Sequence, residues 1–196
     1  MALQPAELHT WFPVSILSVD NILSDADNQQ IIDHVLDLKD FVPPGGSNWN
    51  CQMYTTIGTK NLVEDPKFKL LVDLVSDYVH SYTSALESEF RYTCKEAWAN
   101  VAEAGSFQES HFHATHTVSA VYYPSVPVGS GRIIFESPLE PDMLPLKDIR
   151  CYNNLTFRQA FYEPKPKRLL VFRSYLRHMV EMGTNTDPRI SVAFNF

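Results

Sequence analysis

The chain has 196 residues, of which 44% are hydrophobic and 20% are charged, and its formal net charge is −7. This length fits one domain, which can bury a sizeable core without disulfide bonds. The negative charge disfavours a surface that tracks phosphates, and so disfavours nucleic acid as a partner. No run of residues approaches the length of a transmembrane helix, and the N-terminus lacks the pattern of a secretory signal. We therefore expect no membrane partner.

The cysteines indicate the compartment. Cys51, Cys94 and Cys151 are odd in number and show no Cys-x-x-Cys spacing. A framework of disulfides would need pairs, so a reducing environment fits this pattern better. We expect a cytoplasmic protein, and the sequence gives no indication of its oligomeric state.

The first half of the chain is predicted to hold a strand and two helices. A strand and a turn are expected within residues 11–23, and Asp25 or Asp27 can cap a helix that follows. Residues 43–47 (PPGGS) end this region, and residues 50–56 are predicted to be extended. Apolar residues at helical spacing indicate a second helix over about residues 66–86.

After residue 94 the pattern changes to short β-rich segments separated by turns. They are residues 97–101, 107–113, 117–123, 132–135, 156–162, 168–172, 178–182 and 190–196. Eight such segments at short spacing favour a mainly β fold with flanking helices, in which the strands form a double-sheet jelly roll. We expect a single domain over residues 1–196. Its N-terminal strand and supporting helices occupy residues 1–93, and its jelly-roll catalytic core occupies residues 94–196.

Histidines crowd at the end of the second of these segments. In His111-Phe112-His113, two imidazoles share one face of a strand, because side chains alternate with a period of two. His178 opens a later strand and can complete a facial metal site. A single histidine would more often be an ordinary polar residue, but this spacing favours a metal site. His116 lies beyond the expected strand end. It is predicted to be exposed, or to contact a metal ligand without binding the metal itself.

Arg189 and three other residues are candidates for binding a carboxylate. An arginine at a strand start can form a surface salt bridge, or it can clamp a dicarboxylate through two hydrogen bonds, with Ser191 on the same face. Of the pair Tyr122-Tyr123, one must face inward and could donate to the same carboxylate. Tyr122 is assigned to the core, as is Trp98, whereas Asn100 is a candidate for orienting a ligand.

A set of motifs in fixed order resembles a known family. The motifs are Trp98-Ala99-Asn100, His111-x-His113, residues 119–123 (SAVYY), residues 170–178 (LVFRSYLRH) and residues 189–195 (RISVAFN). They are similar to those of the 2-oxoglutarate- and iron(II)-dependent oxygenases of bacteria and their phages, over roughly residues 95–196. The resemblance implies a double-stranded β-helix, Fe(II), 2-oxoglutarate and dioxygen, in the cytoplasm of a bacterium or a phage-infected cell.

The resemblance also implies roles for single residues. His111, His113 and His178 take the places of the metal ligands. Arg189 takes the place of the arginine that binds the distal carboxylate of 2-oxoglutarate, and Tyr123 resembles its hydroxyl partner.

The sequence departs from the family's pattern at several positions. His113 stands where the wider superfamily has a carboxylate ligand, and Glu109, on the same strand face, could supply a carboxylate instead. Ala120 and Lys167 each replace a usual glycine.

Three functions are consistent with this pattern. The leading one is an Fe(II)- and 2-oxoglutarate-dependent dioxygenase that hydroxylates a small molecule or a peptide. The second is a three-histidine cupin-like iron dioxygenase that does not use 2-oxoglutarate. The third is a jelly-roll binding or viral structural module without catalytic activity.

Overall fold

The computed structural model describes residues 13–46, 50, 53–139 and 147–196. Its strands are β1 (Ile16–Val19), β2 (Tyr54–Thr55), β3 (Glu96–Ala102), β4 (Gln108–His111), β5 (Val118–Ser125), β6 (Ile133–Glu136), β7 (Gln159–Tyr162), β8 (Arg168–Arg173), β9 (His178–Val180) and β10 (Arg189–Asn195). Its helices are α1 (Asp25–Phe41) and α2 (Lys69–Ser84), with two short 3₁₀ turns at Leu62–Glu64 and Pro66–Phe68.

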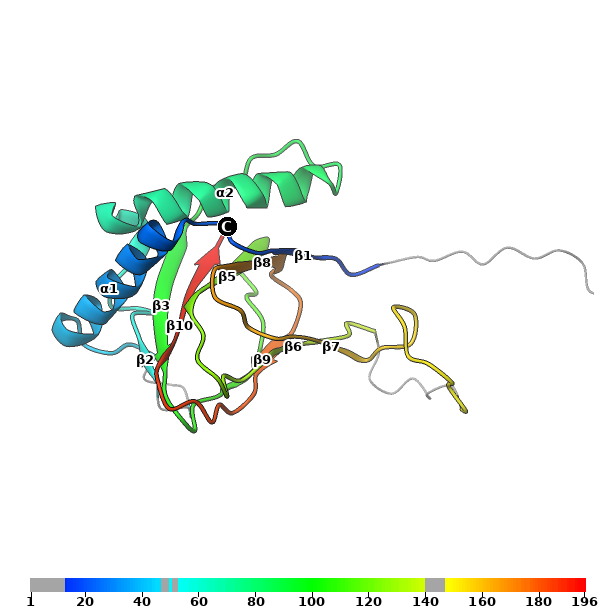
Figure 1. Ribbon diagram of the computed structural model, residues 1–196. Coiled ribbons are helices and arrows are strands. Elements are labelled where there is room, and N and C mark those ends of the chain that lie inside the picture. The colour runs from blue at the N-terminus through cyan, green and yellow to red at the C-terminus, as the bar shows by residue number, and fades with distance from the viewer. Residues whose placement is uncertain (1–12, 47–49, 51–52, 140–146) are drawn as a thin grey trace, which may run out of the picture.

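Within the described residues the strands form two antiparallel sheets that face each other (Figure 1). The larger sheet has the order β1-β8-β5-β10-β3-β2, and the smaller sheet has the order β4-β9-β6-β7. Each of the eight β-rich segments predicted from the sequence overlaps one of the strands β3 to β10. The predicted jelly roll is therefore confirmed.

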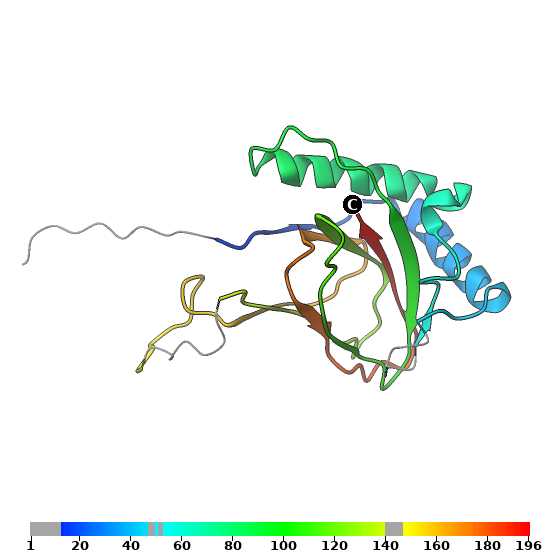
Figure 2. The same cartoon turned by 180° about the vertical axis from the view of Figure 1, so that it is seen from behind.

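Both helices cover the outer face of the larger sheet (Figures 1 and 2). Alternation along the strands explains this packing, since every second residue of a strand faces the helices. On β5, for example, Val118, Ala120 and Tyr122 are buried in the core that the helices and the sheet share. On α2, Leu71 and Val75 belong to the same core.

The residues between these positions face the space between the two sheets. On β8, Leu170 and Phe172 belong to a second, smaller core together with Tyr123 from β5 and Phe135 from β6. Polar residues continue this inner face along β3, β5 and β10. The sheet thus separates a purely structural face from a face that can hold a ligand.

The ends of several elements differ from the sequence-based predictions. Ser24 caps α1 instead of Asp25 or Asp27, because its hydroxyl accepts a hydrogen bond from the backbone N–H of Asp27 at 3.1 Å. The helix predicted over residues 66–86 starts with a 3₁₀ turn, and its α-helical part is Lys69–Ser84. Part of the extended segment predicted at residues 50–56 lies outside the described residues.

Neither α1 nor α2, the α-helices of the described residues, has the length and apolar character needed to cross a membrane. Cys94 and Cys151 are free thiols, and Cys51 lies outside the described residues. The predicted single-domain organisation, with its division near residue 94, stays a prediction.

Candidate metal centre and co-substrate pocket

Three histidines meet between the ends of β4 and β9. His111 and His178 are direct partners across these two strands, and His113 lies two residues beyond the end of β4. One candidate ligand atom from each residue lies within 4.8 Å of the other two. The centroids of the His111 and His178 rings are 4.3 Å apart, and each is 5.3 Å from the centroid of His113. The structure therefore gathers the three predicted ligands at one point.

Backbone carbonyl groups orient two of the rings. The Nδ1 atom of His111 lies 2.7 Å from the carbonyl oxygen of Glu109, and the Nδ1 atom of His178 lies 2.9 Å from that of Leu176. A carbonyl oxygen can only accept, so each Nδ1 carries the hydrogen and each Nε2 keeps its lone pair. A histidine that binds a metal is held in this way, with its second nitrogen donating to a neighbour.

The three imidazoles are neutral at physiological pH. Burial lowers the pKa of His178 to about 3 and that of His113 to about 4, and the nearby histidine rings add to both effects. Burial also lowers the pKa of His111. Neutral nitrogen donors at this spacing fit a divalent transition metal such as Fe(II), since a protonated imidazole cannot ligate.

Two other candidates of the sequence lie outside this cluster. The Glu109 side chain is exposed, and its carboxylate accepts a hydrogen bond from the side chain of Asn50. His116 is paired with Glu96, whose carboxylate oxygen is 3.5 Å from its Nε2 atom. Among the described residues, the group that could hold a metal consists of His111, His113 and His178.

A cavity of about 250 Å³ continues from the histidines between the two sheets. Its lining includes the predicted co-substrate residues Asn100, Tyr123, Arg189 and Ser191. These side chains share the cavity because they occupy inward positions on β3, β5 and β10, which are neighbours in the larger sheet.

Arg189 brings a positive charge into this cavity. Its side chain is only 5% exposed, and its Nη1 atom donates to the carbonyl oxygen of Gly131 at 3.1 Å. The guanidinium carbon lies 6.0 Å from the centre of the Tyr123 ring. Burial raises the pKa of Tyr123 to about 12, although Arg189 acts in the opposite direction. The phenol therefore stays protonated and can donate a hydrogen bond.

The remaining predicted residues lie on opposite faces of the larger sheet: Asn100 and Ser191 face the cavity, and Tyr122 faces the helices. The buried Oδ1 atom of Asn100 accepts no hydrogen bond from the described part of the chain, which suits a group that receives a ligand. Ser191 is buried beside Arg189. Tyr122 points to the helices, where its hydroxyl donates to Asn28 at 2.7 Å, in agreement with its assignment to the core.

Some residues of the cavity had no role assigned from the sequence. Trp98, which was predicted to be core, lies against His113 with 5.9 Å between the ring centroids. Ser119 and Asn195 also line the cavity. Strand alternation could have identified them. Ser119 is four residues from Tyr123 and Asn195 is six residues from Arg189, and residues an even number of positions apart on a strand share one face.

The two positions that depart from the family's glycines are accommodated. Lys167 has a φ of +61°, a left-handed conformation that glycine adopts most easily. Its ammonium nitrogen forms an ion pair with a carboxylate oxygen of Asp25 at 2.5 Å. The Ala120 side chain is 2% exposed and faces the helix-side core. Lys167 thus adopts a backbone conformation that favours glycine, whereas the methyl group of Ala120 contributes to the core.

The fold and the site define a jelly-roll protein with a three-histidine centre and a buried cationic pocket. A family model described as "Putative 2OG-Fe(II) oxygenase" matches residues 96–195, which is half of the chain. The chain belongs to this family, whose members depend on Fe(II) and 2-oxoglutarate. No curated protein matches the chain.

Solved structures share the fold at low sequence identity. The alpha ketoglutarate dependent epimerase SnoN from nogalamycin biosynthesis has a TM-score of 0.68 at 12% identity, with 93% of this chain and 77% of that chain covered. A prolyl-4-hydroxylase of Pseudomonas putida has a TM-score of 0.64 at 14% identity, with 93% and 92% covered. A prolyl hydroxylase of Trichoplax adhaerens has a TM-score of 0.61 at 14% identity, with 92% and 82% covered.

Proposed function

We propose that the protein is an Fe(II)- and 2-oxoglutarate-dependent dioxygenase that hydroxylates a small molecule or a peptide. The observation that carries this proposal is that the histidine cluster and the buried guanidinium of Arg189 line one cavity. A metal chelated by 2-oxoglutarate needs both features. The three-histidine dioxygenase without 2-oxoglutarate and the module without catalysis do not require a positive charge in this cavity.

Each residue of the cavity has a role in this proposal. His111, His113 and His178 hold Fe(II), whose chemistry is to activate dioxygen while 2-oxoglutarate is converted to succinate and carbon dioxide and the substrate gains a hydroxyl group. Arg189 and Tyr123 bind the distal carboxylate of 2-oxoglutarate, the first by charge and the second by its hydroxyl hydrogen.

Ser191 and Asn100 complete the polar wall of the cavity. In this proposal they orient 2-oxoglutarate as hydrogen-bond donors, Ser191 through its hydroxyl group, two residues after Arg189 on the same strand face, and Asn100 through its amide N–H group. Apolar residues such as Phe172 and Ile133 form other parts of the wall and exclude water.

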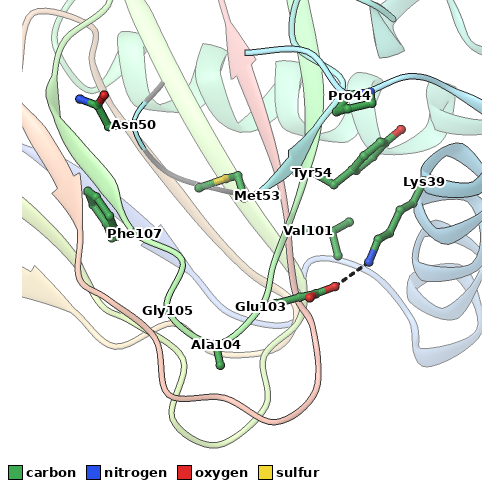
Figure 3. A pocket seen from close by; sticks show the side chains of 10 residues that line it. All are labelled: Lys39, Pro44, Asn50, Met53, Tyr54, Val101, Glu103, Ala104, Gly105 and Phe107. Carbon is green, nitrogen blue, oxygen red and sulfur yellow. Dashed lines mark hydrogen bonds and ion pairs between the residues drawn. The ribbon is translucent and has the colours of Figure 1, made fainter. Parts of the chain in front are cut away.

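A larger groove beside the cavity is the proposed place of the substrate (Figure 3). It measures about 740 Å³, and Met53 lines both the groove and the cavity. Tyr54 and Phe107 give it aromatic walls, while Lys39 and Glu103 form an ion pair of 2.7 Å at its side. Because the two opposite charges neutralise each other, the groove favours a small molecule or a peptide over a polyanion.

Related structures support this range of substrates. SnoN has been solved with Fe³⁺, alpha ketoglutarate and nogalamycin RO, and the Trichoplax enzyme with a peptide fragment of hypoxia inducible factor. The cytoplasmic location and the bacterial or phage origin stay predictions.

Visible spectroscopy under anaerobic conditions tests the proposal. The protein with Fe(II) and 2-oxoglutarate should show a weak metal-to-ligand charge-transfer band, which His178→Ala should abolish. His34→Ala is the matched control, since His34 lies on α1 against Phe68 and outside the cluster. Absence of the band from the unaltered protein, with no succinate formed on any substrate of a broad panel, would refute the proposed function.

A further inference from the structure

A buried network of polar side chains lies behind the histidine cluster. The hydroxyl oxygens of Ser119 and Ser174 are 2.8 Å apart, and the Ser119 hydroxyl donates to the Oδ1 atom of Asn195 at 2.9 Å. Ser119 and Asn195 are partners across β5 and β10. None of the three residues is more than 3% exposed. The network is therefore fixed by the sheet and shielded from water.

The network reaches His113 in two ways. The backbone N–H of His113 donates to the carbonyl oxygen of Ser174 at 2.9 Å. The Asn195 side chain and the His113 ring line the same cavity, and the interaction between them opposes the lowering of the pKa of the ring by burial. His113 is thus held at its backbone by one member of the network and at its ring by another.

His113 needs such support more than the other two histidines. His111 and His178 lie within paired strands, and carbonyl groups of their own strand regions orient their rings. His113 lies beyond the end of β4, where strand pairing no longer fixes its side chain. Orientation of this ring therefore has to come from side chains elsewhere in the fold: Trp98 lies against the ring face, and Asn195 lies in the same cavity.

Burial of the polar side chains of Ser119, Ser174 and Asn195 also costs free energy of folding. A buried hydroxyl or amide costs about 1–3 kcal/mol where its hydrogen bonds are incomplete, and alternating apolar residues would fill the same positions without that risk. A role in the site accounts for their presence.

We propose that Asn195, held in place by Ser119 and Ser174, is a positioning residue that orients the His113 ring as the third metal ligand. The inference rests on the proposed function, because it assumes a metal at the three histidines. In this inference, the positioning of the His113 ring by Asn195 allows a histidine to occupy the place of the carboxylate in the usual facial triad.

Titration with Co(II) alone, followed by its visible absorption bands, tests the inference without turnover. Asn195→Leu replaces the amide by an apolar group with the same branching, and it should raise the Kd for Co(II) about 10- to 100-fold and shift the bands. Asn195→Asp keeps an acceptor beside the ring and should restore most of the affinity. Ser119→Ala should raise the Kd several-fold, because Asn195 then loses one of its anchors.

Asn28→Leu is the matched control. Asn28 is also a buried asparagine with two hydrogen bonds, to Tyr122 and to the carbonyl oxygen of Pro124, but it lies on the helix side of the sheet. This variant should lose a similar amount of thermal stability and keep the Co(II) affinity and spectrum. A purely structural role for Asn195 would make the two variants behave alike.

The outcomes separate the inference from the proposed function. A Kd and a spectrum unchanged in a folded Asn195→Leu protein overturn the inference and leave the proposed function intact. If that variant does not fold, an unchanged Kd in Ser119→Ala overturns it equally. Failure of the unaltered protein to bind Co(II) overturns the proposed metal site and the inference together.

Discussion

Arg189 places a positive charge in a cavity whose three imidazoles are neutral. A hydrogen bond to a charged group contributes about 1.5–3 kcal/mol, which corresponds to about 10- to 100-fold in affinity. Arg189→Met should therefore raise the Kd for 2-oxoglutarate by at least about tenfold, measured from the charge-transfer band at fixed Fe(II). Arg173→Met is the control, since Arg173 is exposed and lies over the Tyr175 ring. Equal affinities in the Arg189 variant and the unaltered protein would remove Arg189 from the co-substrate site.

The buried His178 makes the stability of the metal-free protein depend on pH. Its pKa is about 3 in the folded chain and 6.5 in a reference peptide, so below pH 6.5 the unfolded chain binds a proton that the folded chain does not. The free energy of unfolding should then fall as the pH drops from 6.5 toward 3, by at most about 1.4 kcal/mol per pH unit from this residue.

Urea unfolding in the presence of a chelator measures this effect. Between pH 6.5 and pH 5, His178→Gln should lose about 1–2 kcal/mol less stability than the unaltered protein, because the titrating group is gone. The same pH dependence in both proteins would show that His178 does not titrate as a buried neutral imidazole.

Single residues also show what a sequence can reveal about a site. The spacing of His111 and His113 predicted two neighbouring ligands, since alternation is a property of any strand. The orientation of the His111 and His178 rings could not be predicted, because a backbone carbonyl group has no sequence signal. Asn195 was visible as part of a motif, but its neighbour Ser119 is 76 positions away and becomes its partner through strand pairing.

Successive residues of a strand in the larger sheet face opposite sides, one toward the helices and one toward the cavity. Substitutions of the pair Tyr122-Tyr123 test this assignment of faces. Tyr122→Phe leaves the Oδ1 atom of Asn28 without its donor on the helix side, so the free energy of unfolding should fall by about 1–3 kcal/mol. The Kd for 2-oxoglutarate should not change. Tyr123→Phe should instead raise that Kd about tenfold with a smaller loss of stability, as measured by urea unfolding and spectral titration. Identical effects of the two substitutions would contradict the assignment of faces.

At the scale of elements, the sequence predicted which segments form strands better than where they end. β-Branched, aromatic and other apolar residues mark the interior of β5, β8 and β10, and the sequence predicted all three strands. The end of β4 was placed at His113 and lies at His111, because strand ends depend on pairing with β9, which local sequence does not encode. The start of α1 was placed on an aspartate, although the preceding Ser24 is an equally good cap.

The molecule as a whole depends on the helices for the stability of its larger sheet. α1 and α2 cover side chains such as Val118, Val171 and Val192, each of which is fully buried. Burial of one such side chain stabilises the fold by about 1.5–3 kcal/mol, whereas the total stability of a domain is about 5–15 kcal/mol. Exposure of the whole outer face should therefore outweigh the stability of the sheets themselves.

A fragment of residues 94–196, which contains the histidines and Arg189 but neither helix, should consequently fail to fold and to bind Co(II). Circular dichroism should show no cooperative thermal transition for the fragment, in contrast to the full-length chain. Leu71→Ala in the full-length chain provides an intermediate case, since this fully buried α2 residue should cost about 2–5 kcal/mol without changing the Kd for Co(II). A fragment that unfolds cooperatively and binds Co(II) like the full chain would show that the jelly roll is an independent domain, and that the single-domain organisation predicted from the sequence is wrong.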